Sequence, residues 1–450
     1  MNFKINKNVL FWIESILSER YGLECVLRKD STDINLEIRN EKGYIKFDVN
    51  LPCFNKPCSD FSYTQWHADK EGWDSPFCSP LPAPGLDELD SPLIEQKDGN
   101  YLFHYDLIGL IFWMLARVEE IGRNDLDEHS RFPAKSSHAF KHNYLDRPVV
   151  DEWLEILGQV ISRQWPNVKL KNNHSDIFVS HDVDHPSRFT FCPRNIFFRR
   201  LAGDLLKNRK YQSLYTAPLA RILSRKKISN LDRWNTFEWL MDQCEINDIK
   251  SNFFFQVGIS SGKKDCHYKI FSGQIQNLLL RIHQRGHAIG FHPSYESSFD
   301  ESKFNQEASL FFEICKNKLK LRQNEWGGRM HYLRCKVPQT SRFWGNNNFT
   351  YESSLGYADA PGFRCGTCRE YKAFDATESI ELNLVIKPLI VMECSIFDEN
   401  NRSISIANTH LFKIKERCLK VNGTFNILWH NNFFEKKVYK KIFETVIRKP

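Results

Sequence analysis

The segment IFVSHDVDHP, residues 177–186, is a run of apolar β-forming residues that ends in two aspartates and two histidines. The run predicts a buried strand, which the proline cannot continue. Because an unpaired carboxylate is costly to bury, Asp182 and Asp184 must be solvated, paired or bound to a cation. Their spacing of two places both side chains on one face of a strand, so at its end both can point into one cleft.

Two other predicted strands end in residues of the same kind. His292 follows the strand HAIGF, and Glu296 stands four positions later, a spacing that brings two side chains to one side of a helical turn. His430 closes the last predicted strand, NILW. One carboxylate, one imidazole and a further carboxylate or imidazole would form an open zinc site with a position left for water. The remaining aspartate and histidine could then act as general base and acid.

The elements that must position these residues alternate from about residue 175 onward. Short apolar strand candidates recur between helical stretches: IFVSHDVD, SNFFFQVG, HAIGFHPS, HYLRC, PLIVMEC and FNILWHNN. This alternation favours a parallel sheet or an α/β barrel. In such folds the chemistry gathers at the carboxyl ends of the strands, where the polar residues of this sequence stand.

Residues 1–172 are predicted to form a separate, smaller α/β (α+β) domain. The stretch MNFKINKNVLFWIESILSERYG carries acids within its apolar part, so it predicts an amphipathic helix rather than a signal peptide. The strand candidates DINLEIR and GYIKFDV follow, and YDLIGLIFWMLARVEEIGR and VVDEWLEILGQVISRQW have helical spacing. The polar stretch PNVKLKNNHSD marks the boundary with a second domain at residues 173–450.

A basic helical insertion at about residues 194–232 interrupts the alternation. Within it, residues 194–227 carry ten basic residues against the single acid Asp204, interleaved with apolar residues. The insertion could be a solvated amphipathic helical pair packed on the domain. Alternatively, it could touch an anionic membrane face or a polyanionic substrate.

The composition narrows the class of protein. A hydrophobic fraction of 41% and an aromatic fraction of 14% are typical of a packed globular chain, and a net charge of +7 over 450 residues does not imply nucleic acid. No window approaches the ~20 apolar residues of a membrane span. The thirteen cysteines are scattered through a chain without an export signal. This pattern favours reduced thiols and predicts a cytoplasmic location.

From about residue 175 to 440 the sequence resembles the polysaccharide deacetylase family, carbohydrate esterases that remove N-acetyl groups from sugars. SHDVDHP resembles the first motif of that family. The resemblance implies that Asp182 is the catalytic base and that Asp184 is a metal ligand.

RGHAIGFHPSYE resembles the second motif, in which two histidines four residues apart bind the metal. His292 matches the first of them, whereas Glu296 stands where the family has the second. A carboxylate can ligate zinc, so Glu296 is the predicted third ligand, with His185 as an alternative.

The later motifs of the family are matched more loosely. HYLRCKVP is similar to the third motif, which implies that Arg334 orients the catalytic aspartate. FNILWHNN resembles the last motif, which implies that His430 protonates the leaving group. The family's fourth motif supplies an acid that tunes this histidine, and Glu393 in PLIVMEC stands at a compatible point in the order. SSLGYADAPGFRCGT and YDLIGLIFWMLARVEE resemble a bacterial subgroup with an extra N-terminal domain.

The resemblance implies an incomplete (β/α) barrel behind the N-terminal domain, with one divalent metal, expected to be zinc. The expected reaction removes N-acetyl groups from a carbohydrate, a bacterial surface-polysaccharide precursor, in the cytoplasm. The basic insertion would allow peripheral contact with the inner membrane. Two alternatives remain open: an amidohydrolase acting on a small non-sugar amide, and a catalytically inactive glycan-binding protein, since Glu296 replaces a histidine ligand. The sequence predicts neither the sugar nor the oligomeric state.

Overall fold

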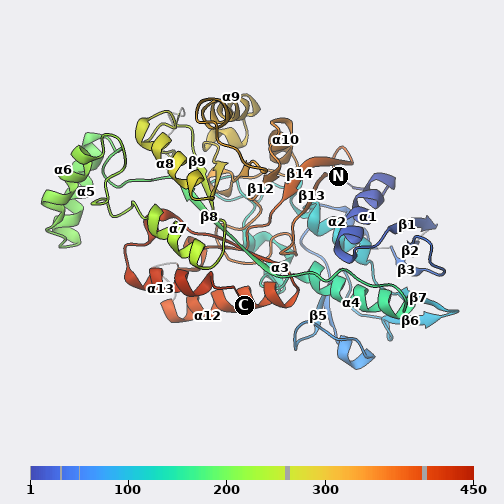
Figure 1. Cartoon of the computed structure of the whole chain (residues 1–450). Helices are drawn as coiled ribbons and strands as arrows, with labels where there is room; N and C mark the ends of the chain where they lie inside the picture. Colours follow the sequence, from blue (N-terminus) through green and yellow to red (C-terminus); the bar gives the residue numbers. More distant parts are fainter. Residues whose placement is uncertain (1, 31–32, 50, 259–263, 398–402, 450) are drawn as a thin grey trace.

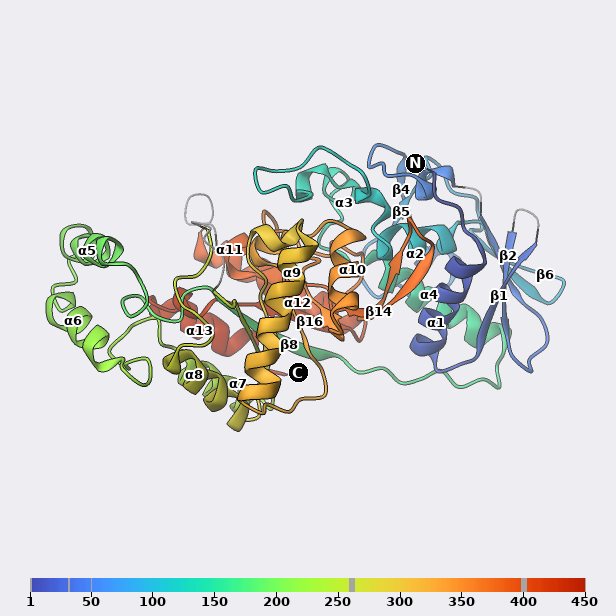
Figure 2. The same cartoon turned by 90° about the horizontal axis from the view of Figure 1, so that it is seen from above.

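The structure is a computed structural model that describes residues 2–30, 33–49, 51–258, 264–397 and 403–449. Two sheets, each with its own helices, lie side by side along the longest dimension of the molecule (Figures 1 and 2). The N-terminal sheet is at the right of both views, and a pair of helices projects at the left. No helix in the described ranges has the length and apolar character needed to cross a membrane.

The N-terminal region is built on a five-stranded sheet in the order β1–β2–β3–β7–β6. Only β3 and β7 run parallel, and the other neighbours are antiparallel. A separate hairpin pairs β4 with β5. The strands are β1 (Cys25–Asp30), β2 (Asp33–Ile38), β3 (Ile45–Asp48), β4 (Tyr63–Trp66), β5 (Leu81–Pro84), β6 (Ile94–Lys97) and β7 (Asn100–Phe103).

The helices α1 (Lys7–Tyr21), α2 (Leu107–Leu115) and α4 (Val149–Gln164) form where the sequence pattern predicts them. In α1, Asn6 caps the first turn by accepting hydrogen bonds from the backbone N–H groups of Asn8 and Val9, and Gly22 ends the helix with φ at 69°. Every residue of α2 is buried, which explains its continuous apolar sequence. The helices are α1 (Lys7–Tyr21), α2 (Leu107–Leu115), α3 (His138–Lys141) and α4 (Val149–Gln164).

The C-terminal region is built on a nine-stranded sheet in the order β13–β14–β12–β11–β10–β9–β8–β16–β15. All neighbours run parallel except β13 and β14. The strands are β8 (Asp176–Val183), β9 (Asn252–Phe255), β10 (Ala288–Phe291), β11 (Gly327–Gly328), β12 (Tyr351–Glu352), β13 (Tyr371–Asp375), β14 (Ile380–Ile386), β15 (Val391–Met392) and β16 (Thr424–Leu428).

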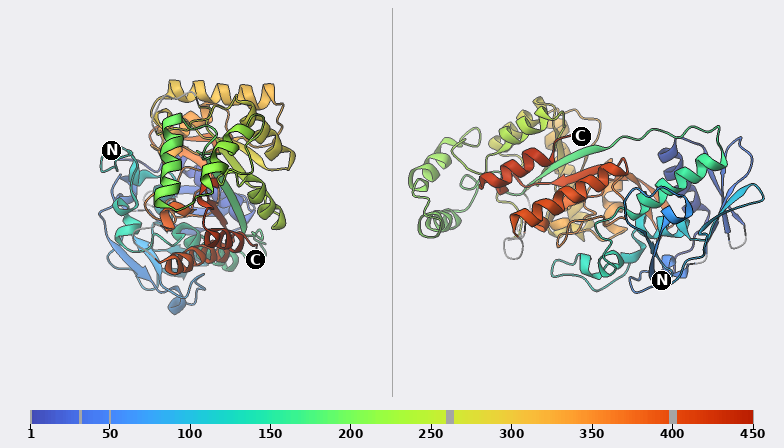
Figure 3. Two further views of the ribbon diagram at one scale, coloured as in Figure 1. Left: turned by 90° about the vertical axis from the view of Figure 1, so that its left-hand side faces the viewer. Right: turned by 90° about the horizontal axis from the view of Figure 1, so that it is seen from below.

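Helices flank this sheet on the outside, and α5 and α6 project away from it (Figure 3, green). A π-helical turn follows α5 and another follows α9. The helices are α5 (Arg194–Ala202), α6 (Ser213–Leu223), α7 (Phe237–Ile246), α8 (Gly273–Gln284), α9 (Glu301–Phe312), α10 (Gln339–Asn346), α11 (Glu393–Ile396), α12 (Ile404–Lys420) and α13 (Lys437–Val446).

One predicted strand is wrong. HYLRC forms the 3-10 turn η8 (His331–Leu333), and the strand at this place in the sheet is the preceding β11, whose two residues are glycines. A Cβ atom on Gly328 would lie 1.8 Å from the Phe291 carbonyl oxygen, so the backbones approach too closely for any larger residue. An apolar pattern cannot predict a strand made of glycine.

The backbone between β14 and β15 crosses from one half of the large sheet to the other. Leu389 N–H donates to Leu355 O at 3.1 Å, and Ile390 N–H donates to Asn426 O at 3.1 Å. The strand pairing in the described chain is nevertheless that of an open sheet. The structure therefore establishes a mixed α/β fold with a large, mainly parallel sheet, while the incomplete barrel stays a prediction.

The two regions share a continuous apolar core. Trp12 of α1 stacks on Phe374 of β13 with ring centroids 4.8 Å apart, and its indole N–H donates to the Lys372 carbonyl. Arg364 reaches Glu120 of the N-terminal region at 2.6 Å, and both side chains are buried. The predicted boundary near residue 172 lies in the segment between α4 and β8.

Candidate functional site

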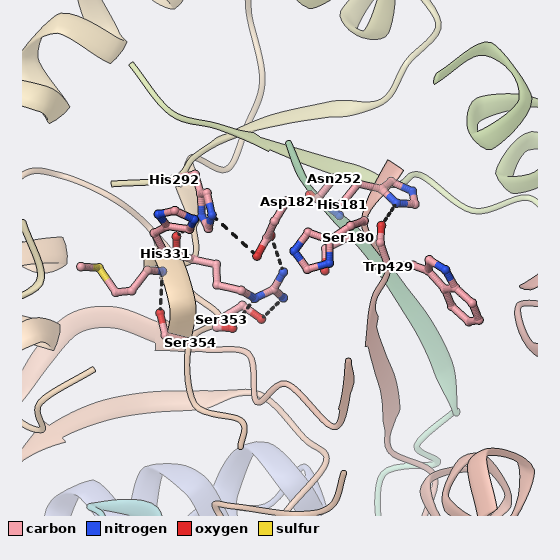
Figure 4. Close-up of polar contacts among 12 residues, drawn as sticks. Ser180, His181, Asp182, Asn252, His292, His331, Ser353, Ser354 and Trp429 are labelled. Carbon is pink, nitrogen blue, oxygen red and sulfur yellow. Dashed lines mark hydrogen bonds and ion pairs between the residues drawn. The ribbon is translucent and has the colours of Figure 1, made fainter. Parts of the chain in front are cut away.

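Four polar side chains meet at the carboxyl ends of the parallel strands. Asp184 follows β8, His292 follows β10, His331 lies in the turn after β11, and His430 follows β16. Because these strands all run in one direction, their ends lie at one edge of the sheet. The side chains line a pocket of about 250 Å³. Figure 4 shows His292 and His331 beside each other, facing Asp182.

Asp184, His292 and His331 have the arrangement of a metal-binding group. Asp184 Oδ1 lies 3.2 Å from His292 Nε2 and 3.4 Å from His331 Nε2. One ligand atom from each residue lies within 4.8 Å of the others. A carboxylate with two imidazoles is a donor set that suits zinc and leaves a coordination position open.

The outer nitrogens of the two imidazoles have the partners that metal-binding histidines need. His292 Nδ1–H donates to the Arg329 carbonyl oxygen at 2.6 Å, and His331 Nδ1–H donates to Asp265 at 3.1 Å. These contacts fix both rings with Nε2 directed at Asp184. His292 Nε2 is buried and makes no well-aligned hydrogen bond within the described chain. The residues present therefore fit a divalent metal ion.

The electrostatics of the group also favour a cation. Burial would raise the pKa of Asp184, but His331 and His292 outweigh burial and hold it well below its usual range. Burial would lower the pKa of His331, but Asp184 and Asp265 raise it to about 9. Asp184 is therefore ionised at neutral pH, and it attracts a positive charge that either an imidazole proton or a metal ion can supply.

Asp182 lies beside this group and is held by an arginine. Arg329 Nη1 donates to Asp182 Oδ1 at 2.9 Å, and Asp182 Oδ2 lies 3.9 Å from His292 Nε2. Arg329 is fully buried and is itself fixed by hydrogen bonds to the backbone carbonyl and the hydroxyl of Ser353. Asp182 is therefore oriented while one of its oxygens faces the candidate metal position.

Arg334 does not contact Asp182, contrary to the sequence prediction. Its guanidinium donates to the carbonyl oxygens of His129 and Tyr295 and lies 3.6 Å from the centroid of the Tyr295 ring. The chain turns away after β11 because Tyr332 and Leu333 adopt positive φ. Arg329, which precedes this turn, occupies the place that the sequence assigns to Arg334.

Glu296 does not join the metal-binding group either. Its side chain is exposed and forms an ion pair with Lys303. The HPSYE segment is not one helical turn, since the 3-10 turn η6 (Glu296–Ser298) begins only at Glu296, so the spacing of four does not bring Glu296 back to His292. His331 is the third member of the candidate metal-binding group instead. The alternative ligand, His185, lines the pocket and stacks on Trp234.

His430 is paired with Glu393 on the other side of the pocket. His430 Nδ1–H donates to Glu393 Oε1 at 2.5 Å, and His430 Nε2 lies 3.6 Å from Asp184 Oδ2. Burial would lower the pKa of His430, but Glu393, with Cys394 beside it, raises the pKa well above its usual range. His430 is therefore a protonated imidazole that faces the candidate metal position. Glu393, Cys394 and His430 form a second group that could hold a metal ion.

The N-terminal region forms part of the pocket wall. Arg131, from the loop before α3, lines the pocket and donates to the Tyr332 carbonyl at 2.8 Å. The same loop is held by Arg334, which donates to the His129 carbonyl at 2.8 Å, and by a contact of 3.1 Å between His129 Nδ1 and Tyr295 Oη. The contact of Arg334 thus attaches the N-terminal loop to the rim of the pocket.

Among the comparisons with known proteins, a family model matches only the N-terminal part of the chain. Residues 2–166 match a family of unknown function (DUF7033), and this match includes the loop that carries Arg131. No curated protein matches the chain. Among solved structures, the chain is similar to a crystal structure from Mycobacterium smegmatis, provisionally assigned as a polysaccharide deacetylase. The identity is 12% and the TM-score 0.39, over 62% of this chain and 84% of that one. A likeness of this size is too weak to assign a function, which has to come from the site.

Proposed function

We propose that the protein is a metal-dependent hydrolase that removes N-acetyl groups from a carbohydrate. The observation that carries the proposal is the meeting of Asp184, His292 and His331 at one strand edge, with Asp182 and His430 within 4 Å of members of that group. The motif order of the sequence supports the same assignment. A divalent metal, zinc being favoured by the donor set, would be held by these three residues. When bound, it would lower the pKa of a water molecule and polarise the acetyl carbonyl.

Asp182 acts as the general base in this proposal. It takes the proton of the attacking water through the carboxylate oxygen that does not bind Arg329. Arg329 holds the other oxygen, which keeps the carboxylate oriented. Fixing the base in this way removes the cost of ordering it during the reaction.

His430 acts as the general acid. An amide has a poor leaving group, so the departing sugar amine must receive a proton as the carbon–nitrogen bond breaks. His430 Nε2 faces the pocket while Nδ1–H is held by Glu393, which keeps the ring charged and oriented. General acid–base assistance of this kind contributes about 10²–10⁴-fold to the rate.

The structure weakens the case for one of the two alternatives and leaves the other open. The case for an inactive glycan-binding protein rested on Glu296 in place of a histidine ligand, and His331 supplies that imidazole from another strand end. An amidohydrolase acting on a small non-sugar amide would use the same site. A bacterial surface-polysaccharide precursor as the substrate rests on the resemblance of the sequence motifs.

Acetate release is the test that separates these functions. The purified full-length protein, loaded with zinc, is assayed against N-acetylated sugars and oligosaccharides and against simple aliphatic amides. Release of acetate from the sugars, abolished by Asp182→Asn and retained by Glu296→Gln, supports the proposal. Turnover of the simple amides alone would assign the amidohydrolase, and zinc binding without turnover of either class would assign the inactive glycan-binding protein.

A further inference from the structure

The solvent-facing side of α6 carries the large apolar residues of that helix. They recur at i, i+1, i+5, i+8 and i+9, which places them on one continuous helical face. The buried side holds only small residues, Ser213, Ala217 and Ala220. This distribution is the reverse of that of a helix packed on a protein core. The exposed fractions are 56% for Leu214, 57% for Tyr215, 43% for Leu219, 58% for Ile222 and 58% for Leu223.

The small residues of α6 form its contact with the segment that contains α5. Ala217 packs with Phe189, Cys192 and Phe197 of the segment that contains α5, in a cluster separate from the main core. Arg221 lies over the Phe197 ring at 5.3 Å. In the hairpin formed by α5 and α6, residues 194–223, α6 therefore packs against the α5 segment through its small side chains. The apolar face of α6 is left without a partner in the described chain.

The hairpin and its flanking residues also present an excess of positive charge. Seven basic side chains are exposed and form no ion pair with a described residue: Arg194, Arg199, Lys207, Arg209, Arg225, Lys226 and Lys227. The one acid in this stretch, Asp204, is buried and paired with Arg188 and Arg233. No carboxylate between residues 194 and 227 therefore offsets the exposed charge.

We propose that the α5–α6 hairpin docks this protein on an anionic membrane surface, with the apolar face of α6 in the interfacial layer. An apolar face flanked by lysine and arginine is what binds a bilayer that carries acidic headgroups. The hairpin projects from the end of the molecule, so α6 can reach a flat surface beyond the rest of the described chain (Figures 1 and 2). A second copy would bring the same positive charge to the interface, which disfavours self-association through this surface.

Vesicle co-sedimentation of the full-length protein tests this inference, which goes beyond the proposed hydrolysis. Vesicles of phosphatidylcholine alone are compared with vesicles that contain roughly 30 mol% phosphatidylglycerol, at low and high salt. Binding should be at least tenfold greater on the anionic vesicles and should weaken as salt is added. Equal binding to both vesicle types, or no binding at low salt, would overturn the inference.

Two sets of variants locate the contact. The triple variant Leu219→Ser, Ile222→Ser, Leu223→Ser and the triple variant Arg225→Glu, Lys226→Glu, Lys227→Glu should each reduce the bound fraction at least fivefold. All six side chains are exposed or half-buried, so the fold should persist, which thermal unfolding checks. Ile406→Ser, at a residue that is 63% exposed on α12, and the pair Lys318→Glu, Lys320→Glu are the matched controls.

The outcomes for these variants separate the membrane from other occupants. Controls that bind as the wild type does, together with both triple variants impaired, support the inference. Triple variants that bind normally would contradict it. A concentration-dependent dimer that the serine variant abolishes would assign the face to a second copy instead. Because binding is read without turnover, none of these results depends on the proposed hydrolase activity.

Discussion

Arg329 Nη1 donates to Asp182 Oδ1 across 2.9 Å, and both side chains are buried at the end of the sheet. The contact joins β8 to the residue after β11, so it depends on the parallel order of the strands between them. It leaves the second carboxylate oxygen of Asp182 facing His292. In the proposed mechanism this pair marks Asp182 as the base and leaves Asp184 for the cation.

Arg329→Lys should lower kcat roughly 100-fold while metal content is retained, because a lysine cannot hold both Asp182 and Ser353 in the same geometry. Kinetics of acetate release and zinc analysis of the same sample check this. Arg334→Lys is the matched control and should leave kcat within about threefold, since Arg334 contacts the rim and not Asp182. A larger effect on kcat from Arg334→Lys than from Arg329→Lys would contradict the assignment.

His331→Gln should reduce bound zinc at least tenfold, because it removes one of three ligands and leaves Asp184 and His292 alone. Glu296→Gln should bind zinc as the wild type does, since its carboxylate is exposed and paired with Lys303. Equilibrium dialysis against zinc measures both. If Glu296→Gln lost the metal and His331→Gln kept it, the ligand set argued from the sequence would hold and the one from the structure would fail.

Glu393→Gln should lower kcat about 10²-fold without loss of zinc, because Gln cannot keep the His430 imidazole protonated and fixed. His430→Ala should cost at least as much, and the double variant should cost little more than His430→Ala alone, since the two residues act as a unit. Ser395→Ala, two residues along the same short helix, is the control and should behave as the wild type does. Additive losses in the double variant would show that the two residues act separately.

Arg131→Gln should raise KM about tenfold and leave kcat and zinc content nearly unchanged, because Arg131 lines the pocket without contacting Asp182 or the metal-binding group. Steady-state kinetics on an N-acetylated oligosaccharide checks the split between KM and kcat. Arg28→Gln, at a side chain that is 67% exposed on the edge strand β1 of the same region, serves as control. An unchanged KM would show that the N-terminal loop does not contact the substrate.

The buried contact between the two regions should make stability depend on acid pH. Burial would raise the pKa of Glu120, but Arg364 and Arg117 outweigh it and lower the pKa to about 2 from its ordinary 4.5. A lowered folded-state pKa means that this stabilisation is complete above about pH 5 and is lost as pH falls toward 2.

Urea unfolding of the wild type and of Glu120→Gln measures that contribution. At pH 6 the variant should be less stable by about 3–5 kcal/mol, because two buried guanidinium groups lose their shared carboxylate. At pH 3 the difference should narrow. Glu128→Gln, at a side chain that is 86% exposed, should match the wild type at both pH values. A difference that stays constant from pH 6 to pH 3 would contradict the role of Glu120.

Much of the fold follows from local sequence pattern. The strands β8, β9, β10 and β16 are short apolar runs that end in polar residues, and the amphipathic spacing of residues 7–21 becomes α1. β11 could not be predicted in this way, since Gly327 and Gly328 form a strand only because neighbouring backbones approach closely. An error there misplaces the residues at the end of that strand, Arg329 and His331.

The candidate site likewise contains residues that the sequence predicts and residues that it does not. Asp182, Asp184, His292 and His430 stand directly at the ends of recognisable strands, and the structure brings them together. Arg329 and His331 were missed because the strand before them was assigned too late in the sequence. One signal was available: both follow the EWGG segment within four residues, in the position that other strand ends use for polar groups. Arg131 could not be found, since its contact with Tyr332 joins residues about two hundred apart.

Anomalous diffraction from crystals soaked in zinc is the most direct test of the central claim. A single strong peak is expected within about 2.0–2.2 Å of Asp184 and of the Nε2 atoms of His292 and His331. A peak held by Glu393, Cys394 and His430, with none near His292, would contradict the account.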